Sequence, residues 1–522
     1  MLGRWRSSQA SSGSVHALPH FETVSIDTNG SEIGDAVEEC PHGTTGQAMR
    51  RFEGAADTAC GQQVRGPARR PGSQFGRRQM TKVTFLELGQ LARAHFAAVA
   101  LPGAVLHVVS AEGPQLTVEH GDLTAETPVM LGSTSKAMTA ALLLQHVDEG
   151  LLRLDDPVRH HLPNMDLPEN VTLADLAHHT SGLDTDATPG HLAQTRSRGF
   201  TYANQNYNLL GEVLGTVSGV QFGRLLSERL LQPLGMHDSG CAPEVVGARG
   251  RTSMFGRNCP APRANYGPMS WIQGPSGGIV ASAEDVGRFL TMILSGGACN
   301  GRQVLSPQAI ATMLEAGVAV QGSPAVSDIF GDSGRYGFGW VTKDIAGHTS
   351  HTHSGKVPHS TSVFGLLPDR GVAFVLVADT GDFLVRTPLL EDLGSAIIQI
   401  LLNQPTGKLP LANVAQMRQT VLNIAYTIFL GVSALGWFPR TRPRHPAGAL
   451  LYHAVLPTAL LLGVRRASRT PWPWLFRFAP DAIGVLAAGC LSLGAAGLVE
   501  AASTKSRCPR RTSSSNHSTP TG

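Results

Sequence analysis

The chain has 522 residues, of which 42% are hydrophobic and 16% are charged. Its length suits about three to four domain-sized units, and its composition excludes a mostly disordered, fibrous or coiled-coil protein. The formal net charge is only +3, and no long basic stripe with interleaved aromatic residues is present. Nucleic acid is therefore not an expected partner.

Seven cysteines are spread along the chain without a CxxC pair. This spacing argues against a zinc finger and against a dense disulfide framework. One bridge among Cys241, Cys259 and Cys299 stays open if the domain is exported, but isolated thiols are the simpler interpretation.

Residues 1–79 are rich in Ser, Gly, Arg, Gln and Glu and lack a long apolar run. We expect this segment to be disordered. An over-extended translation, with Met80 as the true start, explains the composition equally well. We expect no signal peptide at either start. After Met80, polar and charged residues interrupt the stretch from Phe85 to Phe96, whereas the apolar core of a secretory signal is uninterrupted.

Residues 80–405 alternate between helical and strand-like segments and predict one mixed α/β unit of the α+β type. Residues 103–110 are a β-branched run that predicts a buried strand, with 116–120 as its hairpin partner. Two more strands are predicted at 362–367 and 371–379. Strands at both ends with helices between them predict one antiparallel sheet assembled from the two ends, with a helical insertion.

The composition changes after residue 410, where three apolar segments follow one another at 421–438, 446–464 and 482–499. Each is close to the lower limit for a helix that spans a bilayer. Buried core helices are the alternative, but Arg clusters and tryptophans flank the segments like interfacial anchors. We therefore predict three transmembrane helices within 412–503 and a disordered tail at 504–522.

Lys and Arg residues bear on the orientation of these helices. If the unit at 80–405 faces away from the cytoplasm, the first loop between the helices and the tail lie inside with seven Lys and Arg, against four in the second loop. The positive-inside rule then favours an extracytoplasmic domain. The missing signal peptide argues the other way, so the sequence leaves the orientation open.

The first chemical motif lies in residues 131–150, where capping residues, a run of Ala and Leu and a final Gly predict a mostly buried helix. Ser133 and Lys136 are three residues apart, which puts hydroxyl and amine on one face near the helix N-terminus. A partly desolvated Lys with a lowered pKa can remove the proton of a serine nucleophile. Ser-x-x-Lys is common by chance, but none of the other five lysines has a Ser three residues before it.

The second motif is the polar stretch 200–211, in which Tyr202 and Asn204 come just before a predicted helix. One interpretation is a core tyrosine followed by helix-capping asparagines. The other is that Tyr202 shuttles a proton between Ser133 and a leaving group while Asn204 donates its amide to the substrate carbonyl.

The third motif runs from His351 to Lys356 ahead of a predicted strand, and its glycine, Gly355, lets a substrate chain approach the strand edge. Nearby histidines suggest a metal cluster, but no carboxylate or Cys accompanies them, so no metal is expected. These histidines are His348, His351, His353 and His359. Two further histidines, His178 and His179, are expected to pack or to cap before Gly182.

The three motifs occur in the order Ser-x-x-Lys, Tyr-x-Asn and His-x-Gly, at Ser133/Lys136, Tyr202/Asn204 and His353/Gly355. In this order they resemble the serine β-lactamase and penicillin-binding protein superfamily, in the branch of class C β-lactamases, D-alanyl-D-alanine carboxypeptidases and related esterases. Residues 173–183, 274–285 and 336–340 are similar to secondary landmarks of that superfamily. The resemblance covers about 85–400.

The resemblance implies an antiparallel sheet flanked by helices, an all-helical subdomain and a site between them, without a metal or cofactor. It also implies that Ser133 is acylated, that Lys136 and Tyr202 act as base and acid, and that backbone N–H groups of Ser133 and Lys356 form the oxyanion hole. His353 stands where β-lactamases usually carry Lys. A histidine that is largely neutral at pH 7 attracts a substrate carboxylate more weakly, so peptidase or esterase activity is expected ahead of efficient β-lactam hydrolysis.

The expected function is a membrane-anchored serine hydrolase that acts through a Ser133 acyl-enzyme on amide bonds of D-amino-acid-containing peptides or acylated prodrug-type precursors. One alternative is an esterase or acyltransferase with the same serine, and another is a penicillin-binding sensor or scaffold without turnover. The expected partners are a small-molecule or peptide substrate and the lipid bilayer, reached through the C-terminal helices. The expected location is the membrane, with the domain extracytoplasmic.

Overall fold

The computed structural model describes residues 82–189, 191–192, 194, 199–261, 270–320, 334–406, 413–438 and 445–506. The segment 1–79, expected to be disordered, lies outside the described residues, as does the expected tail beyond residue 506. The predicted α/β unit and the three apolar segments fall largely within the described part of the chain.

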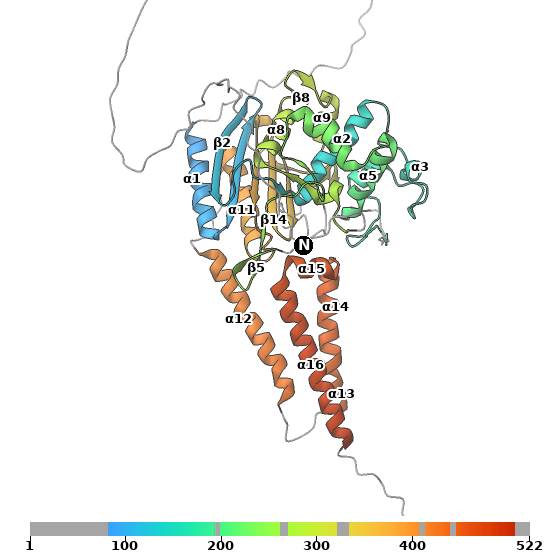
Figure 1. Cartoon of the computed structure of the whole chain (residues 1–522), viewed down its shortest axis with the longest axis vertical. Helices are drawn as coiled ribbons and strands as arrows, with labels where there is room; N and C mark the ends of the chain where they lie inside the picture. The colour runs from blue at the N-terminus through green and yellow to red at the C-terminus, as the bar shows by residue number, and fades with distance from the viewer. Residues whose placement is uncertain are drawn as a thin grey trace, which may run out of the picture. The chain divides into compact units, whose positions relative to one another are not determined.

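An eight-stranded antiparallel sheet forms the centre of the α/β unit (Figure 1), in the order β10-β11-β12-β13-β14-β15-β1-β2. The strands are β1 (Gly103–Ser110), β2 (Gly113–Gly121), β10 (Val318–Ala319), β11 (Arg335–Gly337), β12 (Trp340–Ile345), β13 (His348–Val357), β14 (Ser360–Leu367) and β15 (Val372–Ala378). β1 pairs with β15 on one side and with β2 on the other. This pairing confirms the predicted sheet built from the two ends of the unit.

Strand β1 is buried along its whole length. Because side chains leave a strand alternately on its two faces, Val105 enters one hydrophobic core and Leu106 the other. A strand covered on both faces shows a nearly continuous apolar sequence, which is why residues 103–110 predict it well. Its partner β2 begins at Gly113, three residues before the predicted start, because a register shift after Val108 brings Pro114 opposite Val109.

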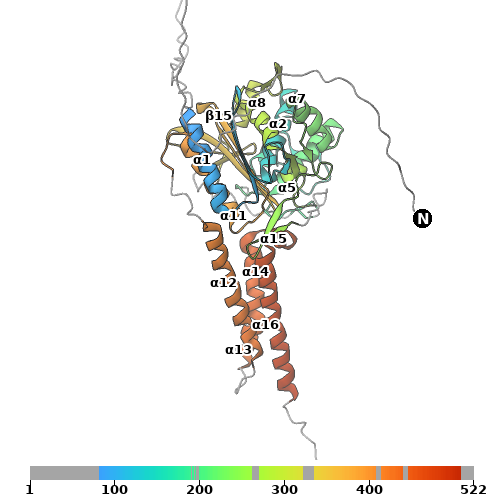
Figure 2. The same cartoon turned by 60° about the vertical axis from the view of Figure 1, so that its left-hand side comes forward.

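Helices cover both faces of the sheet. α1 (Lys82–Val99) packs on β2 and α11 (Arg386–Leu401) on β14, while α8 (Ala283–Leu294) packs on β1 and β15. Figure 2 shows α1 and α11 on one side of the strands and α8 on the other. The helical part of the unit, with α2 (Ser135–Asp148) and α5 (Asn204–Ser218), shares the hydrophobic core on the α8 side.

The remaining elements of the unit are short. The helical ones are η1 (Gly132–Thr134), α3 (Val158–His161), α4 (Leu173–Ala177), α6 (Phe222–Leu226), η2 (Ser227–Leu231), α7 (Gln232–Leu234), η3 (Gly274–Gly278), α9 (Pro307–Met313) and η4 (Pro368–Arg370). The strands are β3 (Val129–Met130), β4 (Gly240–Cys241), β5 (Arg251–Met254), β6 (Arg257–Pro260), β7 (Ile279–Ala281), β8 (Ala298–Cys299) and β9 (Arg302–Gln303). β3, β7 and β4 form a small second sheet, which leads directly into η1.

Three helices in the C-terminal region are long and apolar enough to cross a membrane, as predicted. They span Val414–Trp437, Pro446–Ser468 and Pro480–Ser503, with mean hydropathies of 1.5, 1.7 and 2.1. Their elements are α12 (Val414–Ala434), η5 (Leu435–Trp437), α13 (Pro446–Leu450), η6 (Leu451–Val455), α14 (Leu456–Ser468), α15 (Trp472–Phe478) and α16 (Pro480–Ser506). Protein buries at most 28% of the apolar stretch in any of them.

Cys241, Cys259 and Cys299 are free thiols. No disulfide joins these three residues in the structure.

Candidate active site

Ser133 lies in η1, between β3 and α2. The helix predicted from residue 131 begins at Ser135, and a short 3-10 turn precedes it. The expected side-chain caps are also absent, because the Thr134 hydroxyl donates to the Leu131 carbonyl at 2.9 Å and caps no helical N–H. The chain is nevertheless helical from Thr134 onward, so Ser133 stays one turn before Lys136.

Lys136 is fully buried, and burial holds the pKa of its amine well below the ordinary value. Its Nζ donates to Asn204 Oδ1 at 2.9 Å and to the Ser276 carbonyl at 2.6 Å. A neutral amine has two N–H groups and one lone pair. Because these two acceptors match the two N–H groups, the lone pair is free to take a proton, as a base next to a serine nucleophile requires.

Tyr202 lies in an extended segment just before α5, and Lys136 Nζ is 4.9 Å from the centre of its ring. Burial raises the pKa of the phenol, and the nearby Ser133 hydroxyl opposes part of that rise. The buried phenol oxygen makes no hydrogen bond of standard geometry within the described residues. A phenol in this environment stays protonated at neutral pH and can donate or relay a proton through its neutral form.

Asn204 is the first residue of α5, and the residue that precedes this helix, Ala203, caps it without a side chain. Asn204 is therefore not the helix cap that one interpretation of the sequence proposed. Its carbonyl oxygen binds Lys136, which leaves the NH₂ end of the amide as the group that can donate to a substrate.

His353 lies on β13, where it is buried among aromatic rings. Its Nδ1 donates to the Ser354 carbonyl at 2.7 Å, and its Nε2 accepts from the Tyr336 hydroxyl at 3.3 Å. Burial and the nearby Lys136 amine lower the pKa of His353 to about 3, while the bond to Ser354 acts the other way. The side chain is thus neutral at pH 7, in agreement with the expectation from its residue type.

Gly355 brings β13 against the turn that carries the nucleophile. A Cβ at Gly355 would overlap the Leu131 carbonyl, and a Cβ at Gly132, where φ is +60°, would lie 2.6 Å from the Lys356 nitrogen. The glycine therefore admits the protein's own backbone, rather than only a substrate chain as the sequence suggested. β12 pairs with β13 only as far as Thr352, so the edge of β13 that follows faces η1.

The backbone and the side chain of Lys356 have different neighbours. Its backbone nitrogen is the atom close to Gly132. Its side chain instead pairs with Glu391 on α11 at 2.9 Å and lies over the Phe383 ring at 5.3 Å. The side chain of Lys356 is therefore engaged elsewhere, and the backbone N–H is the group that the resemblance implies for an oxyanion hole.

Two histidines follow α4 and have different surroundings. His178 packs its ring on Phe338 at 4.8 Å, as expected of a packing residue. His179 is buried, with its ring centre 4.5 Å from that of Tyr202. No local pattern in the sequence predicts this contact, because the two residues are separated along the chain and only the landmark segment 173–183 indicates a shared site.

The other candidate histidines do not gather into a metal site. His351 bonds Thr342 at 2.9 Å, and His348 lies 3.9 Å from Asp369. Within the described ranges, no group of three His, Cys, Asp or Glu side chains is arranged to hold a metal ion.

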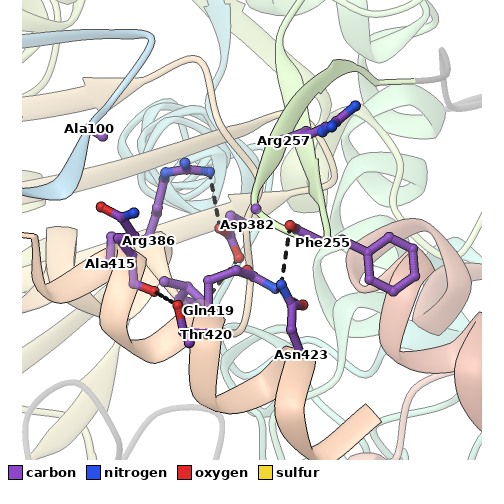
Figure 3. Close-up of a pocket in the computed structure, with 12 residues that line it drawn as sticks. Ala100, Phe255, Arg257, Asp382, Arg386, Ala415, Gln419, Thr420 and Asn423 are labelled. Atoms are coloured by element: carbon purple, nitrogen blue, oxygen red, sulfur yellow. Dashed lines mark hydrogen bonds and ion pairs between the residues drawn. The ribbon is translucent and has the colours of Figure 1, made fainter. Parts of the chain in front are cut away.

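A cavity of about 390 Å³ lies away from these motifs, between the β5–β6 hairpin, α11 and α12 (Figure 3). Its lining includes the Asp382–Arg386 ion pair and the amide of Asn423, which donates to the Phe255 carbonyl. None of the motif residues lines it, so it takes no part in the chemistry of Ser133.

Two solved structures share the fold. The octameric penicillin-binding protein homologue from Pyrococcus abyssi has a TM-score of 0.51 at 22% identity, covering 63% of this chain and 79% of that one. The D-amino acid amidase from Ochrobactrum anthropi has a TM-score of 0.51 at 18% identity, covering 62% of this chain and 99% of that one. At these identities the similarity concerns the fold alone.

Sequence comparisons give closer relationships. Penicillin-binding protein 4 from Amycolatopsis lactamdurans is 30% identical over 300 residues, which cover 52% of this chain and 76% of that protein. The D-alanyl-D-alanine-carboxypeptidase/endopeptidase AmpH from Escherichia coli is 26% identical over 205 residues, so the match spans only 50% of its length. The sequence profile of the Beta-lactamase family matches residues 88–391, more than half of the chain. The chain therefore belongs to the Beta-lactamase family.

Proposed function

We propose that this protein is a serine hydrolase that acts through an acyl-enzyme on Ser133. The observation that carries the proposal is the buried Lys136, whose amine has a lowered pKa and binds two acceptors within reach of Tyr202. Burial disfavours the charged form of the amine, which makes Lys136 a better base than an exposed lysine, and the residue one turn before it is a partly exposed serine.

Acylation uses these groups in sequence. Ser133 Oγ attacks the carbonyl carbon of the substrate while its proton passes to the Lys136 amine. The carbonyl oxygen gains a negative charge, which the backbone N–H groups of Ser133 and Lys356 stabilise. The C–N bond then breaks, and the proton moves from Lys136 through the Tyr202 phenol to the leaving nitrogen.

Deacylation reverses the proton path. Water attacks the acyl carbon and gives one proton to the Lys136 amine through the Tyr202 phenol, the bond between Ser133 Oγ and the acyl carbon breaks, and that proton returns to the serine oxygen. The products are a carboxylic acid and an amine, and no metal or redox step enters this balance.

The proposed substrates are amides of D-amino-acid-containing peptides or of acylated, prodrug-type precursors. The names of AmpH and of the D-amino acid amidase support this substrate class. The neutral His353 supports it as well, because this position offers no positive charge for a substrate carboxylate, in contrast to a lysine. We further propose that the three C-terminal helices anchor the domain at the extracytoplasmic face of a membrane, which protease accessibility of the domain in intact cells would test.

The intact mass of the full chain tests the proposal after incubation with a fluorophosphonate and, separately, with a penicillin. Ser133→Ala is the control, and hydrolysis of D-alanyl peptides and short-chain esters is followed in parallel. Labelling at Ser133 with faster peptide turnover supports the proposed amidase, whereas faster ester turnover supports the esterase. Stable penicillin labelling without turnover would support the sensor, and turnover that survives in Ser133→Ala would overturn the acyl-enzyme.

A further inference from the structure

His179 holds the segment that carries Tyr202 at three points. Its backbone carbonyl accepts from the Thr201 N–H at 2.9 Å. Its ring Nδ1 accepts from the Ala203 N–H at 3.4 Å and faces the Asn206 Nδ2 at 2.9 Å. The residues on both sides of Tyr202, and the first turn of α5, are therefore fixed by one side chain and one carbonyl of the same histidine.

The neighbours of His179 determine which ring nitrogen carries the proton. The Ser181 hydroxyl donates to Asn206 Oδ1 at 2.5 Å, so the NH₂ end of Asn206 is the end that faces the histidine. Two N–H donors thus point at Nδ1, which must be the acceptor, and the proton of the neutral ring lies on Nε2. A second proton on Nδ1 would face both donors, so the ring is held in one neutral tautomer.

The packing around His179 and its burial also favour a neutral ring. The ring centre of His179 lies 4.5 Å from that of Tyr202, 4.8 Å from Tyr336 and 5.3 Å from Tyr207. Burial lowers the pKa of His179 well below its usual value, and the nearby Lys136 and His353 lower it further. The ring therefore fills the space behind Tyr202 without adding a positive charge that would compete with the proton taken up by Lys136.

The backbone at His179 also has an unusual conformation, with φ at +58°. Few residues other than Gly adopt this left-handed region, and Asn, Asp and His are the most frequent among them. His179 follows the C-cap of α4, and its conformation closes the end of this helix. There the His179 N–H bonds the Leu176 carbonyl at 3.2 Å, and the Thr180 N–H bonds the Asp175 carbonyl at 2.8 Å. The conformation directs the His179 carbonyl and ring to the same segment at 201–206.

We propose that His179 is a positioning residue for Tyr202: it fixes the phenol beside Ser133 and Lys136 through its bonds to the flanking backbone. The proposal rests on the proposed function, because it assigns a role relative to the proton relay. His179 takes no proton in the reaction. Its effect is exerted entirely through the location of the Tyr202 oxygen.

A double-mutant cycle on the full chain tests the proposal, with kcat and KM measured on a D-alanyl peptide. His179→Phe keeps the ring but removes the acceptor, so we expect kcat to fall on the order of 100-fold, as for a displacement of about 1 Å at a reacting group, with KM within about twofold. In a Tyr202→Phe background, the same substitution should lower kcat by less than about threefold, because the group that it positions is already gone.

Two further variants separate positioning from general packing. His179→Asn tolerates the positive φ and offers an oxygen as acceptor, so it should recover at least about tenfold of the kcat lost in His179→Phe. His178→Phe is the matched control, since its ring packs on Phe338 and bonds the Ala174 carbonyl, with no bond to the segment at 201–206 among the described residues, and it should change kcat by less than about twofold. If His179→Phe fails to fold, Asn206→Ala removes one donor to the same nitrogen and replaces it in the cycle.

Equal losses of kcat in the presence and absence of the Tyr202 hydroxyl would overturn the proposal, because a purely structural residue acts independently of that group. An Asn variant as poor as the Phe variant would also overturn it. Failure of the proposed function gives a different result, namely peptide turnover that persists in Ser133→Ala.

Discussion

Two helices of this chain are rich in apolar residues, yet protein covers them to very different extents. α2 (Ser135–Asp148) is buried by protein at nearly every position, and its surroundings belong to the main core. α16 (Pro480–Ser506) is at least as apolar, but Leu491 and Leu498 on it are about three-quarters exposed, at 73% and 75%. A helix that is hydrophobic on all sides lies in a large core or in a bilayer, so the exposure of α16 supports the proposed membrane anchor.

The comparison shows how each medium treats polar groups. The core around α2 gives Lys136 two fixed hydrogen-bond acceptors, and both are uncharged. Burial therefore lowers the pKa of the amine. Around α16, His453 bonds the Leu493 carbonyl and pairs with Glu500, which reduces the cost of placing polar groups in lipid. The first arrangement favours the neutral form of the Lys136 amine, whereas the second joins two helices.

The largest expected effect is the loss of peptide turnover when a serine is replaced in the α2 segment rather than in α16. Ser133→Ala at the start of the α2 segment should lower peptide turnover by at least about 10⁴-fold and abolish fluorophosphonate labelling, because the nucleophile is lost. Ser492→Ala on α16 removes a hydroxyl that only accepts from Trp437 Nε1, and it should change turnover less than about twofold. Comparable losses in the two variants would contradict the assignment of the chemistry to α2.

Lys136→Met should lower kcat by roughly 100-fold or more, because the base is lost, while it raises the free energy of unfolding at pH 7. The pKa of Lys136 is lowered in the folded chain and has its ordinary value of 10.5 in the unfolded one. Between these two pKa values Lys136 is protonated in the unfolded chain and neutral in the folded one, so the free energy of unfolding of the wild type rises with pH. The difference in stability between the wild type and Lys136→Met that this proton causes disappears near the unfolded pKa.

Thermal unfolding of both proteins in detergent micelles, from pH 6 to about pH 10.4, measures this difference. The gap in unfolding temperature between Lys136→Met and the wild type should narrow as the pH rises. A difference in unfolding temperature that stays constant with pH would show that Lys136 is charged in the folded protein. This result would contradict its proposed role as the base.

Leucine truncation compares the two media directly. Leu143→Ala in α2 opens a cavity in a protein core and should cost about 2–5 kcal/mol in the free energy of unfolding. Leu491→Ala should cost less than about 1 kcal/mol, because lipid tails cover that side chain and are as apolar as leucine. Unfolding of each variant in micelles, followed by loss of fluorophosphonate labelling, checks the ranking, and equal costs would show that α16 is covered by protein.

The smallest effect is expected at the third motif, where two neighbouring histidines differ. His351→Ala removes a side chain that bonds only Thr342 among the described residues and should leave kcat within about twofold. Steady-state kinetics on the D-alanyl peptide checks this value. A loss beyond tenfold would place His351 in the site beside His353.

Much of the fold follows from local sequence patterns. The β-branched run at 103–110 is a strand, and the three apolar segments after residue 410 are helices long enough to cross a membrane. The start of the helix at 131 was wrong by four residues, because capping residues also form other turns. Thr134 bonds the Leu131 carbonyl and Ser362 instead of capping, and Ser362 comes from a strand far along the chain.

The amino-acid sequence by itself determined the strands at 103–110, 362–367 and 371–379, where apolar length suffices for a membrane, and the order of the three motifs. It did not show that the third motif itself lies on a strand, β13. Periodicity and residue type act over a few neighbouring residues, so one segment contains that information. Only the tertiary structure decided that Lys136 is buried against Asn204 and Ser276, which are 68 and 140 residues away, and that His179 lies behind Tyr202. A pKa and a proton path depend on burial and distance, and both are set by residues that meet only when the chain has folded.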